Sequence, residues 1–167
     1  NSCNPAFVTI GLTMGSTHFA NYFSNFGLTA LTGIDLPGEA GSIYHANLNR
    51  QELASSAFGQ SFQVTPLQLI TACSAAVNGG RLMQPYIVKQ VIDSDGNVVS
   101  TTEPVVKRQV VSEEISKEIA LYLEQVVVDG SGTHAQIPGY RVGGKTGTSE
   151  KLDIKEKKHV LSFFGFA

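Results

Sequence analysis

Charged side chains are missing from two long stretches of this chain of 167 residues. No Asp, Glu, Lys or Arg occurs before Asp35, and none occurs from Leu53 through Gly80. Neither stretch has the pattern of a membrane span, because Asn, Ser, Thr, Gln and Gly interrupt both of them throughout. These two uncharged stretches therefore predict no insertion into a membrane.

Cysteine is scarce as well, because Cys3 and Cys73 are the only two in the sequence. Two cysteines are too few to indicate a disulfide framework, and the apolar helical pattern around Cys73 favours a buried free thiol. No cluster of Cys, His and Asp has the spacing of metal ligands. A net charge of −2 gives no electrostatic reason to expect nucleic acid as a partner. The composition indicates neither a metal site nor a nucleic-acid interface.

What is present is the pattern of one globular domain, with 42% hydrophobic and 16% charged residues. Asn4 followed by Pro5 predicts a helix start with Asn4 as the N-cap, and Gly15 is expected to end this helix. A second short helix is predicted over 17–26, and we expect its stripe of aromatic residues to lie in the core.

The strongest helix signal lies in VTPLQLITACSAAVNGG, residues 64–80. Thr65 is the predicted N-cap, Gln68 completes a capping box, and the glycine pair at 79–80 is expected to end the helix. Ser112 begins another long helix, with acidic residues in its first turn. The expected apolar face of the 64–80 helix consists of Leu69, Ile70, Cys73, Ala76 and Val77.

Strand patterns occupy much of the second half of the chain. Residues 85–100 predict a β-hairpin. Residues 140–142 are expected to lead as a strand into Lys145–Thr148, with 160–167 as its antiparallel neighbour and the charged segment 150–159 as the connection. Helices and antiparallel strands in one compact unit predict an α+β fold.

The stretch GYRVGGKTGTSEK, residues 139–151, fits two unrelated chemistries. From Gly139 it matches the phosphate-loop pattern G-x-x-x-x-G-K-[ST]. That loop needs a buried strand before it and a helix directly after its Lys-Thr. Here Pro138 precedes the stretch, a glycine follows Thr146, and too few residues remain for the rest of a nucleotide-binding sheet. The phosphate-loop interpretation is therefore rejected.

From Lys145 onward, the same stretch contains the K-T-G motif of enzymes that acylate a serine with a peptide or a β-lactam. Such enzymes combine K-T-G with S-x-x-K, which carries the nucleophile, and with S-x-N. Ser2-Cys3-Asn4 supplies S-x-N directly ahead of a predicted helix and far upstream of Lys145. The order and spacing of these two motifs favour a serine acyltransferase.

The segments NSCNPAF, TGIDLPGE, FGQSFQVTPLQLITACSAAVNGGRLMQPYIV and GGKTGTSEK resemble the transpeptidase domain of class B penicillin-binding proteins, in particular the division and sporulation type of Gram-positive, clostridia-like bacteria. The resemblance is collinear and spans essentially the whole chain. It implies the fold that these proteins share with serine β-lactamases, an antiparallel sheet packed with helices. The active site would lie between the sheet edge and an all-helical region, and no cofactor is implied.

The resemblance also implies roles for the residues of both motifs. Ser2 would help to pass the nucleophile's proton to the leaving amine. Asn4 would bind the amide of the substrate's side chain, in addition to its expected capping role. Gly59 and Gln60 are interpreted as structural support.

In the K-T-G strand, Lys145 would supply positive potential toward the carboxylate of the substrate. The hydroxyls of Thr146 and Thr148 would form charge-assisted hydrogen bonds around that carboxylate. The N–H of Thr148 would be one oxyanion donor. Gly147 would allow the substrate backbone to approach the strand edge.

The sequence departs from the family pattern in one respect: no lysine has a serine three residues before it, so S-x-x-K is absent. We therefore expect residues 1–167 to be part of a transpeptidase domain, without the upstream S-x-x-K segment and the final helix.

The intact protein is expected on the extracytoplasmic face of the bacterial membrane, held by an N-terminal anchor outside these residues. Its expected partners are peptidoglycan stem peptides, β-lactams, and division or sporulation proteins. The alternative is a catalytically silent relative that senses β-lactams or serves as a division scaffold.

The absence of S-x-x-K leads to a first prediction. The chain of 167 residues by itself is expected to form no stable adduct with penicillin, because the attacking serine is missing. Mass spectrometry after incubation with penicillin checks this expectation. A covalent adduct located on any residue of the chain would contradict it.

Overall fold

The computed structural model describes residues 2–150 and 159–167 of the chain. Most of the charged connection expected at 150–159 lies outside these residues. The helices are α1 (Asn4–Met14), α2 (Ser16–Asn25), α3 (Arg50–Ala57), α4 (Pro66–Val77) and α5 (Glu113–Asp129), with a short 3₁₀ turn η1 (Thr133–Ala135). The strands are β1 (Arg81–Met83), β2 (Gln90–Ile92), β3 (Val98–Thr101), β4 (Val106–Gln109), β5 (Gly143–Glu150) and β6 (His159–Phe166).

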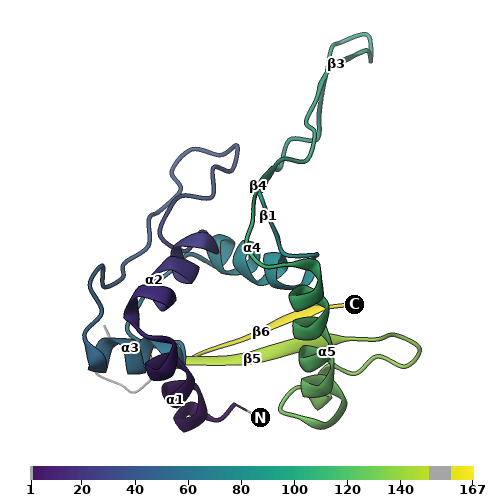
Figure 1. Ribbon diagram of the computed structural model, residues 1–167. Coiled ribbons are helices and arrows are strands. Elements are labelled where there is room, and N and C mark those ends of the chain that lie inside the picture. Colours follow the sequence, from purple (N-terminus) through teal and green to yellow (C-terminus); the bar gives the residue numbers. More distant parts are fainter. Residues whose placement is uncertain (1, 151–158) are drawn as a thin grey trace.

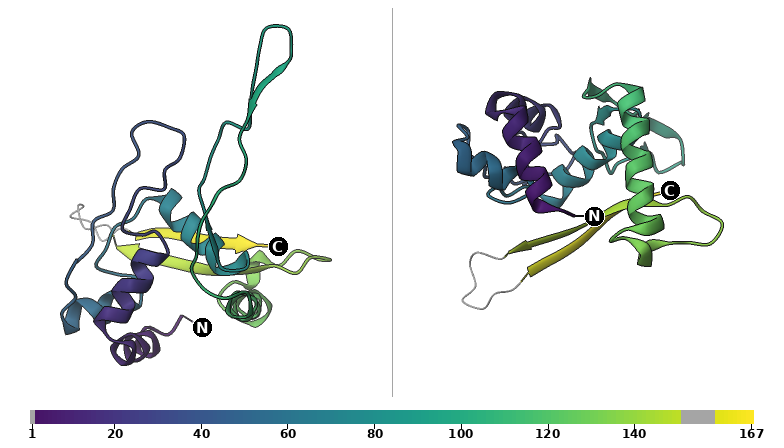
Figure 2. Two further views of the ribbon diagram at one scale, coloured as in Figure 1. Left: turned by 45° about the horizontal axis from the view of Figure 1, so that its top comes forward. Right: turned by 60° about the horizontal axis from the view of Figure 1, so that its bottom comes forward.

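The strands form antiparallel pairs, β1 with β4, β2 with β3 and β5 with β6, which confirms the α+β class. Helix α1 packs on α2 and α3, whereas α5 packs on α4 and β5. Helices α1 to α4 lie on one side of the long β5–β6 pair, as the right-hand view of Figure 2 shows. The β2–β3 hairpin projects away from the rest of the molecule (Figure 1). In the described part of the chain, no helix is both long and apolar enough to cross a bilayer.

Helix α1 begins one residue earlier than predicted. Cys3 takes the N-cap position, Asn4 is the first helical residue, and no side chain caps the helix. The predicted capping role of Asn4 is therefore wrong. The physical reason is Pro5, which is tolerated anywhere in the first turn because the N–H it lacks would have no partner within the helix. The side chain of Asn4 remains exposed and is not consumed by capping.

The aromatic stripe of α2 packs against the segments that lead to α3 and α4. Phe23 stacks on Phe19, with 6.1 Å between ring centroids, and meets Phe62 edge to face at 5.0 Å. Tyr44 approaches Phe23 from a third side at 6.0 Å. Tyr22 lies outside this cluster and is 46% exposed. No residue of α2 is buried, so the prediction that the stripe lies in the core is wrong: the rings of Phe19 and Phe23 contact other rings but stay partly exposed.

Helix α4 has the predicted N-terminus but not the predicted apolar face. Thr65 and Gln68 form the predicted capping box, in which each side chain bonds the other residue's backbone N–H. Leu69 and Ile70 are 44% and 47% exposed. The buried residues of α4 are Gln68, Ala72 and Ala75. The small side chains of Ala72 and Ala75 allow α5 and β1 to approach α4 closely. The size of the side chains, rather than their hydrophobicity, therefore decides which face of α4 is buried.

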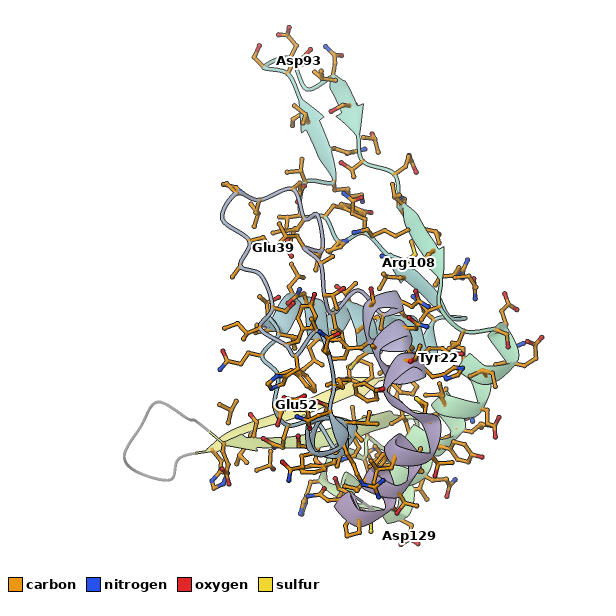
Figure 3. The ribbon with its side chains drawn as sticks, turned by 60° about the vertical axis from the view of Figure 1, so that its left-hand side comes forward. Tyr22, Glu39, Glu52, Asp93, Arg108 and Asp129 are labelled. Atoms are coloured by element: carbon orange, nitrogen blue, oxygen red, sulfur yellow. The ribbon has the colours of Figure 1, made fainter. Side chains whose placement is uncertain are left out.

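The predicted hairpin is present as β2 and β3, and Asp93 organises its turn. The carboxylate of Asp93 accepts hydrogen bonds from the backbone N–H groups of Asp95 and Asn97 and from the side chain of Asn97. Figure 3 shows Asp93 at the far tip of the projection. The β1–β4 pair at its base was not predicted, because strands of 3 and 4 residues carry too little alternation to be recognised.

Strands β5 and β6 pair in continuous register, from Gly143 opposite Phe166 to Glu150 opposite His159. The expected strand at 140–142 is wrong, because β5 begins only at Gly143. Arg141 donates two hydrogen bonds to the carboxylate of Glu124 on α5, at 2.8 and 2.6 Å. This ion pair holds the segment against the helix instead of in the sheet.

The buried amide of Gln68 leads to a prediction for stability. Gln68 is 1% exposed, and its Nε2 donates to the carbonyl of Ala30 at 2.8 Å. Gln68→Ala is expected to lower the free energy of unfolding by about 2–4 kcal/mol, because it removes half of the capping box and leaves that carbonyl without its partner. Chemical denaturation measures the change.

The matched control is Thr65→Ser, which keeps the capping hydroxyl and is expected to cost less than about 1 kcal/mol. A Gln68→Ala protein as stable as the wild type would show that the amide does not tie α4 to the segment after α2.

Candidate active site

Lys145 and Ser2 are 143 positions apart in the sequence and in contact in the structure: Lys145 Nζ donates to Ser2 Oγ at 3.1 Å. The ammonium also donates to the carbonyl of Thr146 at 2.7 Å and to its hydroxyl at 3.4 Å. An ammonium carries hydrogens but no lone pair, so Ser2 must be the acceptor. The hydrogen of the Ser2 hydroxyl is therefore available to another group.

Two different parts of the fold hold these side chains. Ser2 directly precedes Cys3, the N-cap of α1, and the hydrogen bond from Lys145 brings its hydroxyl to β5. Lys145 belongs to β5, which β6 pairs along its whole length and α5 packs against. These candidate site residues therefore lie where the start of α1 meets the long strand pair.

Thr146 and Thr148 direct their backbone groups away from β6. In an antiparallel pair, alternate residues point both N–H and C=O either at the neighbouring strand or away from it. The carbonyl of Thr146 accepts from Lys145, and that of Thr148 accepts from Gln60 Nε2 at 3.4 Å, so this alternate set faces the open edge. The N–H of Thr148 lies on the same open edge of β5.

The charge of Lys145 is partly removed from water and has no acidic neighbour in the described residues. Burial lowers the pKa of the Lys145 ammonium, because desolvation disfavours its charged form. The ion pairs found among residues 2–150 and 159–167 join His45 to Glu52 and Arg141 to Glu124, and neither includes Lys145. A half-buried cation surrounded by neutral oxygens favours an anionic ligand.

The other predicted site residues lie near Ser2 in the sequence or near Lys145 along β5. Asn4 is exposed on the first turn of α1, two positions after Ser2. Gly147 follows Thr146 in β5, and a Cβ there would lie 2.6 Å from the hydroxyl oxygen of Ser162 on β6. The side chain of Ser162 on β6 therefore leaves no room for a Cβ at position 147. This contact favours glycine there whether or not a ligand also approaches the strand.

Two residues outside the predicted motifs also contact β5. Gln60, expected only as support, reaches the Thr148 carbonyl as described above. Ser131 Oγ lies 3.3 Å from Thr146 Oγ1, and the sequence carried no signal for it. A serine in a glycine-rich loop has no spacing rule that would connect it with a strand residue 15 positions later.

Comparison with known proteins identifies the family. The family described as the penicillin binding protein transpeptidase domain matches the chain over residues 1–167. The chain belongs to this family. Stage V sporulation protein D from Bacillus subtilis is 48% identical over 173 residues, which cover 100% of this chain and 27% of that protein. A probable peptidoglycan D,D-transpeptidase FtsI from Caulobacter vibrioides is 31% identical over 175 residues, which cover 100% of this chain and 28% of that protein.

Solved structures of penicillin-binding proteins have the same fold. The crystal structure of PBPA from Mycobacterium tuberculosis matches with a TM-score of 0.86 at 26% identity, over 99% of this chain and 37% of that chain. The D,D-transpeptidase domain of a peptidoglycan glycosyltransferase from Eggerthella lenta matches with a TM-score of 0.82 at 28% identity, over 97% and 43% of the two chains. The resemblance predicted from the sequence is confirmed, and the chain is much shorter than these penicillin-binding proteins.

The placement of Ser2-Cys3-Asn4 at an open surface leads to a prediction for thiol reactivity. Cys3 is exposed, whereas Cys73 is partly buried and burial raises the pKa of its thiol. Iodoacetamide is therefore expected to alkylate Cys3 at least about tenfold faster than Cys73, because only an accessible thiolate attacks it. Peptide mapping by mass spectrometry measures both rates, and equal rates would contradict this placement of the S-x-N segment.

Proposed function

We propose that the intact protein is a serine D-alanyl-D-alanine transpeptidase that cross-links peptidoglycan and is acylated by β-lactams. The contact that carries this proposal is the 3.1 Å hydrogen bond between Lys145 Nζ and Ser2 Oγ, because it unites two separate motifs of this chemistry in one place. The name of the Caulobacter vibrioides relative, a probable peptidoglycan D,D-transpeptidase, supports the same activity. A structure of penicillin-binding protein A from Mycobacterium tuberculosis as a ceftriaxone acyl-enzyme complex supports acylation by β-lactams.

In the proposed reaction, the hydroxyl of an S-x-x-K serine attacks the carbonyl of the penultimate D-alanine. An ester C–O bond forms, the C–N bond to the terminal D-alanine breaks, and the departing amine takes up a proton. The amino group of a second stem peptide then attacks the ester and gives up a proton, and the serine hydroxyl is restored. Both halves need a group that moves a proton at the reacting nitrogen.

Ser2 suits this proton transfer because of its hydrogen-bond partner. Its oxygen accepts from Lys145, so its own hydrogen is free to be donated to the departing amine. In the same role it can relay the proton that the attacking serine loses. We assign general acid–base catalysis to Ser2 on this basis.

The open edge of β5 suits the binding of a peptide chain. Lys145 and the hydroxyls of Thr146 and Thr148 would bind the terminal carboxylate of the donor peptide. The N–H of Thr148, on the open edge, would donate to the oxyanion that forms at the attacked carbonyl. Gly147 would keep side-chain atoms away from the bound peptide, and Asn4 would bind the amide of the substrate's side chain.

The intact protein would act on the extracytoplasmic face of the cytoplasmic membrane, where its peptidoglycan substrate lies. A segment outside these residues would anchor it there. Division or sporulation proteins are its proposed partners, in line with the names of its relatives.

Lys145→Ala in the complete protein tests the proposal. We predict that the rate of acylation by penicillin falls about 10²- to 10³-fold, because the site loses the charge that attracts the carboxylate and aligns Ser2. Thermal stability is expected to change little, since Lys145 makes no ion pair within the described residues. Stopped-flow measurements with a fluorescent penicillin give the rate.

Lys89→Ala is the matched control, because Lys89 is an exposed lysine just before β2, in the projection that leads away from the site. It is expected to leave the acylation rate unchanged. A folded wild-type protein that penicillin does not label would instead favour the catalytically silent relative, and an unchanged rate in Lys145→Ala would remove this lysine from the site.

A further inference from the structure

The loop that follows α5 brings one more hydroxyl to the edge of β5. Ser131 Oγ lies 3.3 Å from Thr146 Oγ1, which in turn lies 3.4 Å from Lys145 Nζ. Ser2 Oγ lies 3.1 Å from the same ammonium. Four polar side chains thus form a continuous row in the order Ser131, Thr146, Lys145 and Ser2.

The backbone on the C-terminal side of Ser131 is fixed to the last turn of α5. The helix ends at Asp129, which is labelled at the lower end of the molecule in Figure 3. The N–H of Gly132 donates to the carbonyl of Val126 at 2.9 Å. The side-chain amide of Gln136 donates to two further carbonyls of that turn, at 2.9 and 3.0 Å. Because α5 also packs along β5, the loop holds Ser131 at a defined place beside the strand.

The hydrogen count of the row leaves a donor free. Ser131 and Thr146 each carry one hydroxyl hydrogen, and a single bond between their oxygens uses only one of them. Whichever residue donates, the other hydroxyl hydrogen can be donated to a ligand. Ser131 is exposed, so a ligand at the β5 edge can reach it. A hydroxyl donor close to a half-buried ammonium forms an environment suited to a carboxylate.

We propose that Ser131 is a further carboxylate-binding residue of this site and acts together with Lys145 and Thr146. The ligand group would be the terminal carboxylate of the acyl-donor peptide, or the carboxylate that β-lactams carry in its place. This inference rests on the proposed function, and it adds a residue from outside the S-x-N and K-T-G motifs to the determinants of substrate recognition.

The test compares Ser131→Ala with the wild type in the full-length protein, using benzylpenicillin and its methyl ester. For benzylpenicillin, the second-order acylation rate is expected to fall about 5- to 20-fold, because a charge-assisted hydrogen bond is lost. The loss should appear mainly in the dissociation constant of the non-covalent complex, since a carboxylate contact is made before and during acylation. For the methyl ester, which lacks the charge, a change of less than about twofold is expected.

Ser131→Thr keeps a hydroxyl and should restore most of the rate, and Thr133→Ala in the same loop is the control for altered loop structure. Equal losses with both ligands would overturn the inference, because they would show a structural role. An acylation rate in Ser131→Ala equal to that of the wild type would overturn it as well. A wild-type protein that neither ligand acylates would overturn the proposed function and, with it, the role of Ser131.

Discussion

The ammonium of Lys145 is the group around which the candidate site is arranged. It is partly withdrawn from water, and within the described residues it is bound only by hydroxyl and carbonyl oxygens. Neutral acceptors satisfy its hydrogens without cancelling its charge, so the site keeps a positive potential that an acidic partner would remove. The same bonds orient the hydroxyls beside it. One cation therefore favours an anionic ligand and leaves the Ser2 hydrogen free to be donated.

Strand β5 carries these groups along the edge that does not pair with β6. One edge is paired to β6, and the other carries the backbone groups of Thr146 and Thr148. Over the part of the chain that the structure describes, two side-chain hydrogen bonds link residues 2–63 with β5, one from Lys145 to Ser2 and one from Gln60 to Thr148. Few side-chain hydrogen bonds therefore join residues 2–63 to β5 over the described part of the chain.

Local signals in the sequence were sufficient for much of the fold. The capping box at Thr65 and the hairpin turn near Asp93 depend on neighbouring residues, and both are present in the structure. The cap at Asn4 and the strand at 140–142 were wrong, because Pro5 fits more than one position of a first turn and Arg141 is held by a distant acid. The buried face of α4 depends on the close approach of other elements, which hydrophobicity alone does not encode.

The residues of the S-x-N and K-T-G motifs could be proposed from the sequence as candidate site residues, because the order and spacing of these motifs are typical of one chemistry. Their contact could not, since it joins two ends of the chain across the fold. Ser131 had no signal at all, because its place beside Thr146 depends on how the loop folds back on α5.

The most direct test of the central contact is a double-mutant cycle in the intact protein, with Lys145→Ala, Ser2→Ala and the double variant compared by penicillin acylation rate. If the two residues act as one unit, the double variant should be scarcely slower than the slower single variant, whereas multiplicative losses would show that the lysine and the serine act independently.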